Sequence, residues 1–268
     1  MSKQSTSNSL KSLFAAIVIP IAFLVAVLFY MFFLGNPANF EDNNPGNHPL
    51  NYFGTMHKGG PIVPVLISCF LIAIIFAIER FLTIRRSKGT SSIEVFVAKI
   101  RALMKVGDLE GARAECQKQR GSIANVVDAG IHLYQQIETD KNLNKERKIL
   151  AIQKELEEAT TLELPMLSKN LVIISTIASV ATLLGLLGTV IGMIRAFQAL
   201  AQAGAPDAVA LSTGISEALI NTALGVLTST IAIIFYNYFT SKIDSITYGI
   251  DEAGYSIVQT FASRYKES

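Results

Sequence analysis

Long apolar stretches alternate with charged stretches along this chain of 268 residues. Four apolar runs are long enough, at ~20 residues or more, for a helix to cross a bilayer. These runs are residues 13–34, 61–79, 166–203 and 209–239. The pattern predicts an all-α integral membrane protein with four transmembrane helices, a helical cytoplasmic domain between the second and third, and a C-terminal cytoplasmic helix.

The charged block between the second and third runs, residues 80–165, has apolar positions at helical spacing. Gly107 followed by Asp108 predicts the end of one helix and the N-cap of the next. Gly121-Ser122 predicts a second break, with Ser122 as the N-cap. Mixed charges along residues 143–164 are typical of a solvated face or of bridging between subunits.

The distribution of positive charge predicts the orientation in the membrane. Most of the 23 Lys and Arg residues lie in the charged block, and the turn at residues 204–208 has none. Because positively charged segments stay in the cytoplasm, we expect the N-terminus (1–12), the block and the tail (240–268) to be cytoplasmic. The loop of residues 35–60 and the turn would then face the other side.

The first apolar run has two interpretations. A positive start with Lys3 and Lys11, followed by an apolar core, is typical of a secretory signal peptide. The core, residues 13–34, is longer than the ~7–15 residues of a signal core, and no clean small-residue cleavage site follows Gly35. These features favour an uncleaved membrane helix, and the sequence leaves open whether the segment is retained.

Composition argues against several other classes of protein. Hydrophobic residues make up 50% and charged residues 16% of the chain, and a net charge of +2 is too small to suggest binding of nucleic acid. Cys69 lies in an apolar run and Cys116 in the charged block, which argues against a disulfide or a metal site. His48 and His57 share a loop without cysteine or paired carboxylates, as surface histidines do. With no nucleophile–base pair and no phosphate-binding loop in the sequence, we expect neither an enzyme nor a cofactor.

The third apolar run has features that a helix facing only lipid does not need. Gly185, Gly188 and Gly192 give it a small-residue face, and the last two have the GxxxG spacing that lets membrane helices approach closely. Thr189 places a hydroxyl near mid-membrane, and Arg195 places a charge near the end of the span. We therefore expect this helix to pack against other protein helices.

Glu217 lies inside the fourth run, where an ionisable side chain costs roughly 2.5–3.5 kcal/mol. Glu217 and Arg195 are equally far from Pro206 in the turn, so they should lie at one depth and could form an ion pair. Thr189 and Thr222 should share a second, deeper level.

The fourth run also has a polar face. At 100° per residue, Glu217, Asn221 and Thr228 fall within roughly 40° of one another. Gly225 adds a small position for helix packing. A hydrated ion path needs such acids and hydroxyls at matched depths; alternatively, the hydroxyls bond only to their own helix carbonyls and the glycines only pack helices. The predicted ion pathway comprises Thr189, Glu217, Asn221 and Thr222.

With these residues in view, the chain resembles the ExbB/TolQ branch of the MotA/TolQ/ExbB proton channel family over about residues 56–240. Residues 177–197, with Leu-Leu-Gly-Leu-Leu-Gly-Thr, carry the strongest similarity. Residues 215–225, which begin Ile-Ser-Glu-Ala-Leu-Ile-Asn-Thr, are the second match and are continued by Tyr236-Asn237. Gly59-Gly60-Pro61 and Glu79-Arg80 add weaker support.

The resemblance implies a subunit of the bacterial inner membrane that forms a homo-oligomeric ring, with a pentamer as the expected size. The last two spans would line a central pore, in which a partner of the ExbD/TolR kind places its single membrane helix. Proton passage would drive an envelope or outer-membrane process such as transport. Thr189 and Thr222 match the family's pore threonines, and Glu217 matches its pore-region glutamate.

The chain departs from the family pattern in three respects. Thr182 and Ile231 stand where the family often has proline, and an N-terminal span is added to the usual three. Four spans are also found in MotA, which lacks the Leu-Leu-Gly-Leu-Leu-Gly-Thr motif. The coupling ion, proton or sodium, therefore stays open, as do the partner and the driven process. The alternatives are a MotA-like stator subunit and a non-conducting membrane scaffold.

Overall fold

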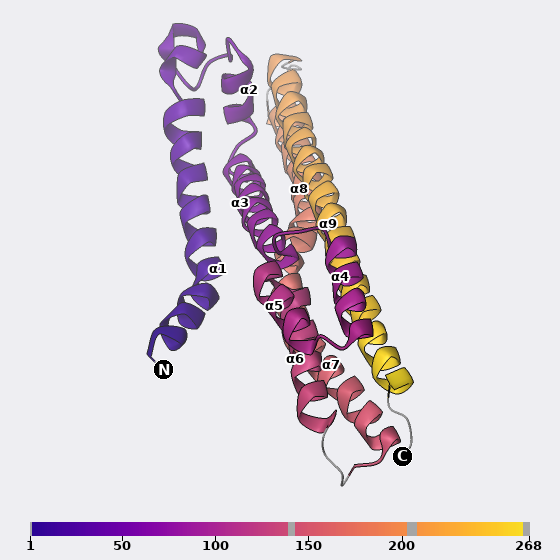
Figure 1. The fold of residues 1–268 in the computed structure, drawn as a ribbon. Helices are drawn as coiled ribbons and strands as arrows, with labels where there is room; N and C mark the ends of the chain where they lie inside the picture. The colour runs from indigo at the N-terminus through magenta and orange to yellow at the C-terminus, as the bar shows by residue number, and fades with distance from the viewer. Residues whose placement is uncertain (1, 139–142, 203–207, 265–268) are drawn as a thin grey trace. The chain divides into compact units, whose positions relative to one another are not determined.

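The computed structural model describes residues 2–138, 143–202 and 208–264, and every named element in these ranges is a helix (Figure 1). Four helical stretches are long and apolar enough to cross a membrane. They lie within Phe14–Leu34, Ile62–Val106, Lys145–Gln198 and Leu211–Ser263. The predicted all-α membrane protein is thus confirmed. Most of the predicted turn at 204–208 lies outside the described residues.

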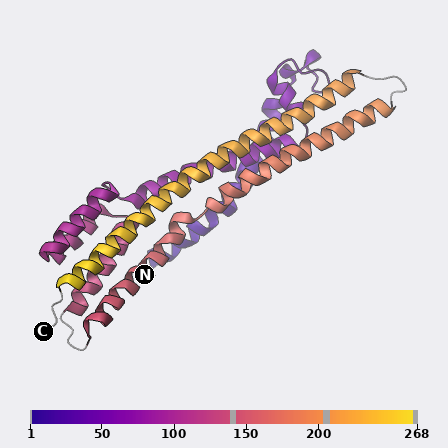
Figure 2. The ribbon, with the colours of Figure 1, turned by 90° about the vertical axis from the view of Figure 1, so that its right-hand side faces the viewer.

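The chain divides into two compact units, and each is described by itself. The apolar unit comprises Met1–Ile78 and Asn170–Tyr236, and the charged unit comprises Glu79–Lys169 and Asn237–Ser268. The helices of the apolar unit are α1 (Ser2–Leu28), α2 (Tyr52–Lys58), α8 (Leu171–Gln202) and the first parts of α3 (Ile62–Lys88) and α9 (Ala208–Arg264). In this unit α8 and α9 run side by side (Figure 1 and Figure 2).

Side chains of the Asn-rich loop after α1 form hydrogen bonds within the loop and to the residues that precede it. α1 continues as a π-helical stretch, Phe29–Leu34, and two short 3-10 turns follow at Pro37–Asn39 and Glu41–Asn43. The amide of Asn39 donates to the carbonyls of Phe33 (2.9 Å) and Leu34 (3.0 Å), and Asn51 donates to the Asn39 side chain. Asn51 also caps α2 by accepting from the Gly54 N–H. These bonds tie α2 back to the end of α1.

The charged unit packs α4 (Ile93–Val106), α5 (Leu109–Gln119), α6 (Ser122–Glu138) and α7 (Lys145–Ser168) with the last part of α9. Its core includes Phe96, Ile131 and Tyr134, whose ring meets Phe261 edge-on at 4.8 Å. Apolar stripes on these helices bury against one another, as the spacing of apolar residues predicts.

The predicted breaks in this unit are confirmed, with one correction. Gly107 has a left-handed φ of 82° and ends α4, and the Asp108 carboxylate accepts from the Gly111 N–H at 2.8 Å. The prediction that Ser122 is an N-cap is wrong by one residue. Ser122 is the first helical residue, because the carbonyl of Gly121 (φ 84°) already accepts the helix bond from Asn125.

Arg80 is buried, at 2% exposure, and joins α3 to the end of α7 inside the charged unit. Its guanidinium pairs with the neighbouring Glu79 carboxylate through two nitrogens. It also donates to the carbonyls of Met166 (3.3 Å) and Leu167 (3.2 Å), which the last turn of α7 leaves unpaired. α7 runs on through Pro165, and the helix breaks only after Ser168.

Candidate ion pathway

Glycines set the close approach of α8 and α9. A Cβ on Gly188 would lie 2.4 Å from the Asn221 Cβ, and one on Gly192 would lie 2.8 Å from the Ala218 Cβ. Gly185 and Gly225 face each other, and a Cβ on Gly225 would lie 2.8 Å from the Gly185 Cα. The four predicted packing glycines therefore all lie at the contact between the two helices of one hairpin.

Thr189 and Thr222 meet across this contact. Their hydroxyl oxygens are 3.2 Å apart, so the matched depth predicted from the hairpin is confirmed. Thr222 also donates to the Gly185 carbonyl at 3.1 Å, and Thr189 to the Leu186 carbonyl at 2.6 Å. The Thr189 hydroxyl also lies 3.4 Å from the Gly185 carbonyl. Two hydroxyl protons thus serve four hydrogen bonds and can redistribute among them. The same bonds also fit the alternative in which these hydroxyls serve helix packing.

Glu217 lies nearer the turn and is partly buried. It lines a small cavity of about 40 Å³ together with Arg195 and Asn221. Arg195 and Glu217 thus face one cavity, as their equal distance from the turn predicted, but no direct ion pair joins them among the described residues. Their pairing stays a prediction. Arg195 and Lys58 both lie within electrostatic range of the Glu217 carboxylate.

Asn221 is the most deeply buried member of the predicted pathway, at 2% exposure. Its side-chain nitrogen donates to the Gly59 carbonyl at 2.9 Å. Its oxygen, Oδ1, is buried and has no hydrogen-bond partner in the described part of the chain. Further along the polar face, Thr228 is buried, and the Ser229 hydroxyl donates to the Ala178 carbonyl of α8.

The sequence did not place the turn before α3 beside this cavity. Gly59, Pro61 and Ile62 form one wall of it. Gly60 has a left-handed φ of 76°, and a Cβ there would lie 3.2 Å from Nη1 of Arg195. The only signal for this turn was the Gly59-Gly60-Pro61 motif, which gives no indication of what packs against it.

His57, just before this turn, is held by Tyr30 of the π-helical stretch that follows α1. Its ring stacks on Tyr30 with centroids 4.4 Å apart, and the Tyr30 hydroxyl donates to the His57 carbonyl at 3.0 Å. Phe40 meets the imidazole edge-on at 5.6 Å. Burial lowers the pKa of His57 below its ordinary value. His57 is therefore half-buried and packed against aromatic rings, whereas His48 is exposed.

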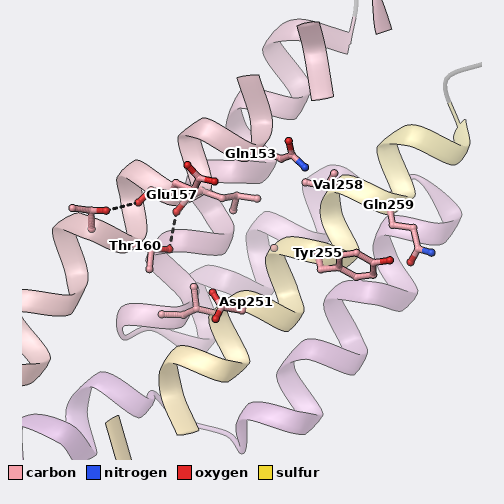
Figure 3. A pocket seen from close by; sticks show the side chains of 11 residues that line it. Gln153, Glu157, Thr160, Asp251, Tyr255, Val258 and Gln259 are labelled. Atoms are coloured by element: carbon pink, nitrogen blue, oxygen red, sulfur yellow. Dashed lines mark hydrogen bonds between the residues drawn. The ribbon is translucent and has the colours of Figure 1, made fainter. Parts of the chain in front are cut away.

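A larger groove, of about 710 Å³, lies in the charged unit between α7 and α9 (Figure 3). Gln153, Glu157, Asp251 and Tyr255 line it. The Thr160 hydroxyl donates to the Leu156 carbonyl of its own helix at 2.7 Å and so does not project a free donor. No metal-ligating cluster of three or more His, Cys, Asp or Glu side chains occurs in the described ranges, here or elsewhere.

The observed geometry defines a class of protein: a multi-pass helical membrane protein with an acid, an amide and two facing hydroxyls inside a helix hairpin. The profile of the MotA/TolQ/ExbB proton channel family matches residues 120–252. The chain belongs to this family, on its ExbB/TolQ branch.

Named relatives agree with this assignment. A protein of Methanothermobacter thermautotrophicus named as a homolog of the biopolymer transport protein ExbB is 28% identical over 73% of this chain and 66% of its own length. The Tol-Pal system protein TolQ of Haemophilus influenzae is 36% identical over 31% of this chain and 37% of its own. The biopolymer transport protein ExbB of Aquifex aeolicus is 38% identical over 29% of this chain and 52% of its own length. The matches thus span between 37% and 66% of these relatives' lengths.

Proposed function

We propose that the chain is a ring-forming subunit of an inner-membrane motor driven by the proton motive force. The observation that carries this proposal is the Thr189–Thr222 hydroxyl contact, with the Glu217 cavity nearer the turn on the same two helices. Hydroxyls that exchange protons, in line with an acid, form the kind of path along which a proton moves through a membrane protein. The family of proton channels to which the chain belongs supports the same function.

The proposed layout has four transmembrane helices, at residues 13–34, 61–79, 166–203 and 209–239. Both termini and residues 80–165 are cytoplasmic, while residues 35–60 and 204–208 face the periplasm. The distribution of Lys and Arg supports this orientation.

In the proposed assembly five copies surround the single membrane helix of an ExbD/TolR-like partner, and α8 and α9 line the pore. The partner transmits the energy to an envelope process such as transport. The names of the relatives, a Tol-Pal system protein and a biopolymer transport protein, support a role in such a process.

Proton flux into vesicles tests the function. The complex of this chain with its partner is reconstituted, and an inward pH gradient is applied with sodium either present or replaced by potassium. Replacing Thr222 by Val or Glu217 by Gln should lower the flux about tenfold or more, since loss of one buried hydrogen-bonding group costs about 1–3 kcal/mol and 1.4 kcal/mol is a factor of ten. Both variants should assemble as the wild type does.

Thr176→Val is the matched control, because the Thr176 hydroxyl on α8 is exposed and bonds only to the Val172 carbonyl of its own helix. Its flux should equal that of the wild type. Full flux in an assembled Thr222→Val, Glu217→Gln double variant would sink the proposal and favour a non-conducting scaffold. A flux that requires sodium would identify sodium as the coupling ion.

A further inference from the structure

The buried amide of Asn221 is only half satisfied. Its nitrogen is fixed by the 2.9 Å bond to the Gly59 carbonyl, so the amide cannot flip without placing two acceptors against each other. The oxygen, Oδ1, is therefore the atom left without a partner in the described part of the chain. Since native structures rarely leave a buried acceptor unpaired, a group outside the protein chain is expected to complete it.

The cavity beside Asn221 has the size and chemistry for water. Its volume of about 40 Å³ exceeds the ~10–15 Å³ that one water needs, so about two or three fit. The Glu217 carboxylate and Asn221 Oδ1 accept hydrogen bonds, and the Arg195 guanidinium donates them. A water in this cavity can therefore find the two to four polar partners that hold a buried water in place.

The same lining disfavours a metal cation. Among the described residues that line the cavity, only Glu217 and Asn221 supply side-chain oxygens, and hard cations take about six or more oxygen ligands. Arg195 adds a positive charge to the same wall. The remaining lining residues are glycine, proline and isoleucine, whose side chains offer no ligand for a cation.

We propose that this cavity binds an ordered water cluster that bridges Asn221 Oδ1 to the Glu217 carboxylate. Asn221 thereby holds the water through which protons reach Glu217 from the side of the loop at residues 35–60. This role of the water rests on the proposed proton-conducting function, whereas the water site itself does not. Asn221 is a positioning residue, and its nitrogen also ties the Gly59 turn to α9.

A high-resolution map of the wild-type complex in lipid nanodiscs tests the water site directly. We expect density for ordered water within hydrogen-bond distance of both Asn221 Oδ1 and Glu217. A dry cavity, or an Oδ1 that accepts a hydrogen bond from a protein group instead, would overturn the inference. This measurement needs no variant and does not depend on proton flux.

Two substitutions of Asn221 separate a hydration role from a packing role. Leu has nearly the shape of Asn and fills the site with apolar atoms, whereas Ala leaves room for an additional water. If Asn221 positions water, Asn221→Leu should lower proton flux about tenfold, and Asn221→Ala should lower it less, because an additional water can take the place of the lost amide. A packing role predicts the reverse order, because Ala leaves the larger void, and that order would overturn the inference.

Ser229→Ala is the matched control, because Ser229 makes a buried bond between the same two helices away from the cavity. Its flux should stay near that of the wild type. A wild-type complex that carries no flux contradicts the proposed function. The density map then still shows whether the cavity binds ordered water. If Asn221→Leu does not assemble, the map of the wild type decides the inference.

Discussion

At the scale of single residues, the hairpin of α8 and α9 brings polar side chains of similar depth together. The depth of a residue depends only on the rise per residue of a helix, so Thr189 and Thr222 could be matched by their distance from the turn alone. Their hydroxyls indeed meet at 3.2 Å. Counting also put Arg195 and Glu217 at one level, and they share a cavity. Whether two side chains touch also depends on their rotamers and neighbours, which the number of residues from the turn does not predict.

Asn221 shows what the pattern could not provide. Its place on the polar face was predicted, but its partner, the Gly59 carbonyl, lies far away in sequence. Every residue has a backbone carbonyl, so a sequence pattern does not indicate which carbonyl accepts the hydrogen bond. The turn that supplies it is positioned by Tyr30 and His57, which pair through ring stacking.

Cys116 gives a prediction that depends on pH. Burial, and then the Asp128 carboxylate, raise the pKa of the Cys116 thiol from 9.0 to about 12. In a Cys69→Ala background, the remaining thiol of the folded protein should react with iodoacetamide at pH 8 about a thousandfold more slowly than after denaturation, because only the thiolate attacks. Rates of alkylation followed by mass spectrometry check this.

The same shift affects stability at high pH. The folded state holds the thiol proton that the unfolded state releases near pH 9.0, so this contribution to stability is present below that pH and is lost as the pH rises toward 12.

The control for the alkylation experiment is Gln117→Cys in a chain lacking both native cysteines, since Gln117 is exposed. Equal reaction rates at positions 116 and 117 in the folded protein would contradict the prediction.

At the scale of elements, the ends of helices were more predictable than their contacts. Gly107 and Asp108 fix the α4–α5 break locally, through a left-handed φ and a side-chain cap. The end of α7 was not predictable in this way, because Pro165 is tolerated inside the helix and Arg80 on α3 binds the last carbonyls. That contact links positions far apart in sequence, and no local signal encodes it.

The buried contacts of Arg80 therefore lead to a prediction about the stability of the charged unit. Arg80→Leu removes the guanidinium that pairs with Glu79 and donates to the carbonyls of Met166 and Leu167, and should destabilise the charged unit by about 3–5 kcal/mol. Arg80→Lys should cost less, about 1–3 kcal/mol, since an ammonium keeps the charge but not the planar fork. Thermal unfolding of the detergent-solubilised protein, with a fall in Tm of about 2–4 °C per kcal/mol, measures both.

Arg85→Leu is the control for Arg80, because Arg85 lies on the same helix but is exposed. Its Tm should change by less than that of either Arg80 variant. Equal shifts for Arg80→Leu and Arg85→Leu would show that Arg80 does not act through its buried contacts.

At the scale of the whole molecule, the first span is joined to the apolar unit by specific contacts. Phe14 meets Phe76 of α3 edge-on at 5.7 Å, and Asn39 holds the carbonyls of Phe33 and Leu34. Tyr30 contributes the ring stack and the hydrogen bond to His57. These contacts fit the interpretation of a membrane helix that stays with the protein.

Tyr30→Phe tests whether the first span orders the loop at residues 35–60. The ring stack is kept, but the bond to the His57 carbonyl, worth about 0.5–1.5 kcal/mol, is lost. Amides of α2 should then exchange hydrogen up to about tenfold faster, because local opening becomes less costly. Hydrogen-exchange mass spectrometry on the solubilised protein measures this, with Phe32→Leu as the control, since Phe32 is 71% exposed. Unchanged exchange in Tyr30→Phe would mean that the loop is ordered by its own asparagine contacts, and that the first span is not needed to hold the turn against Asn221.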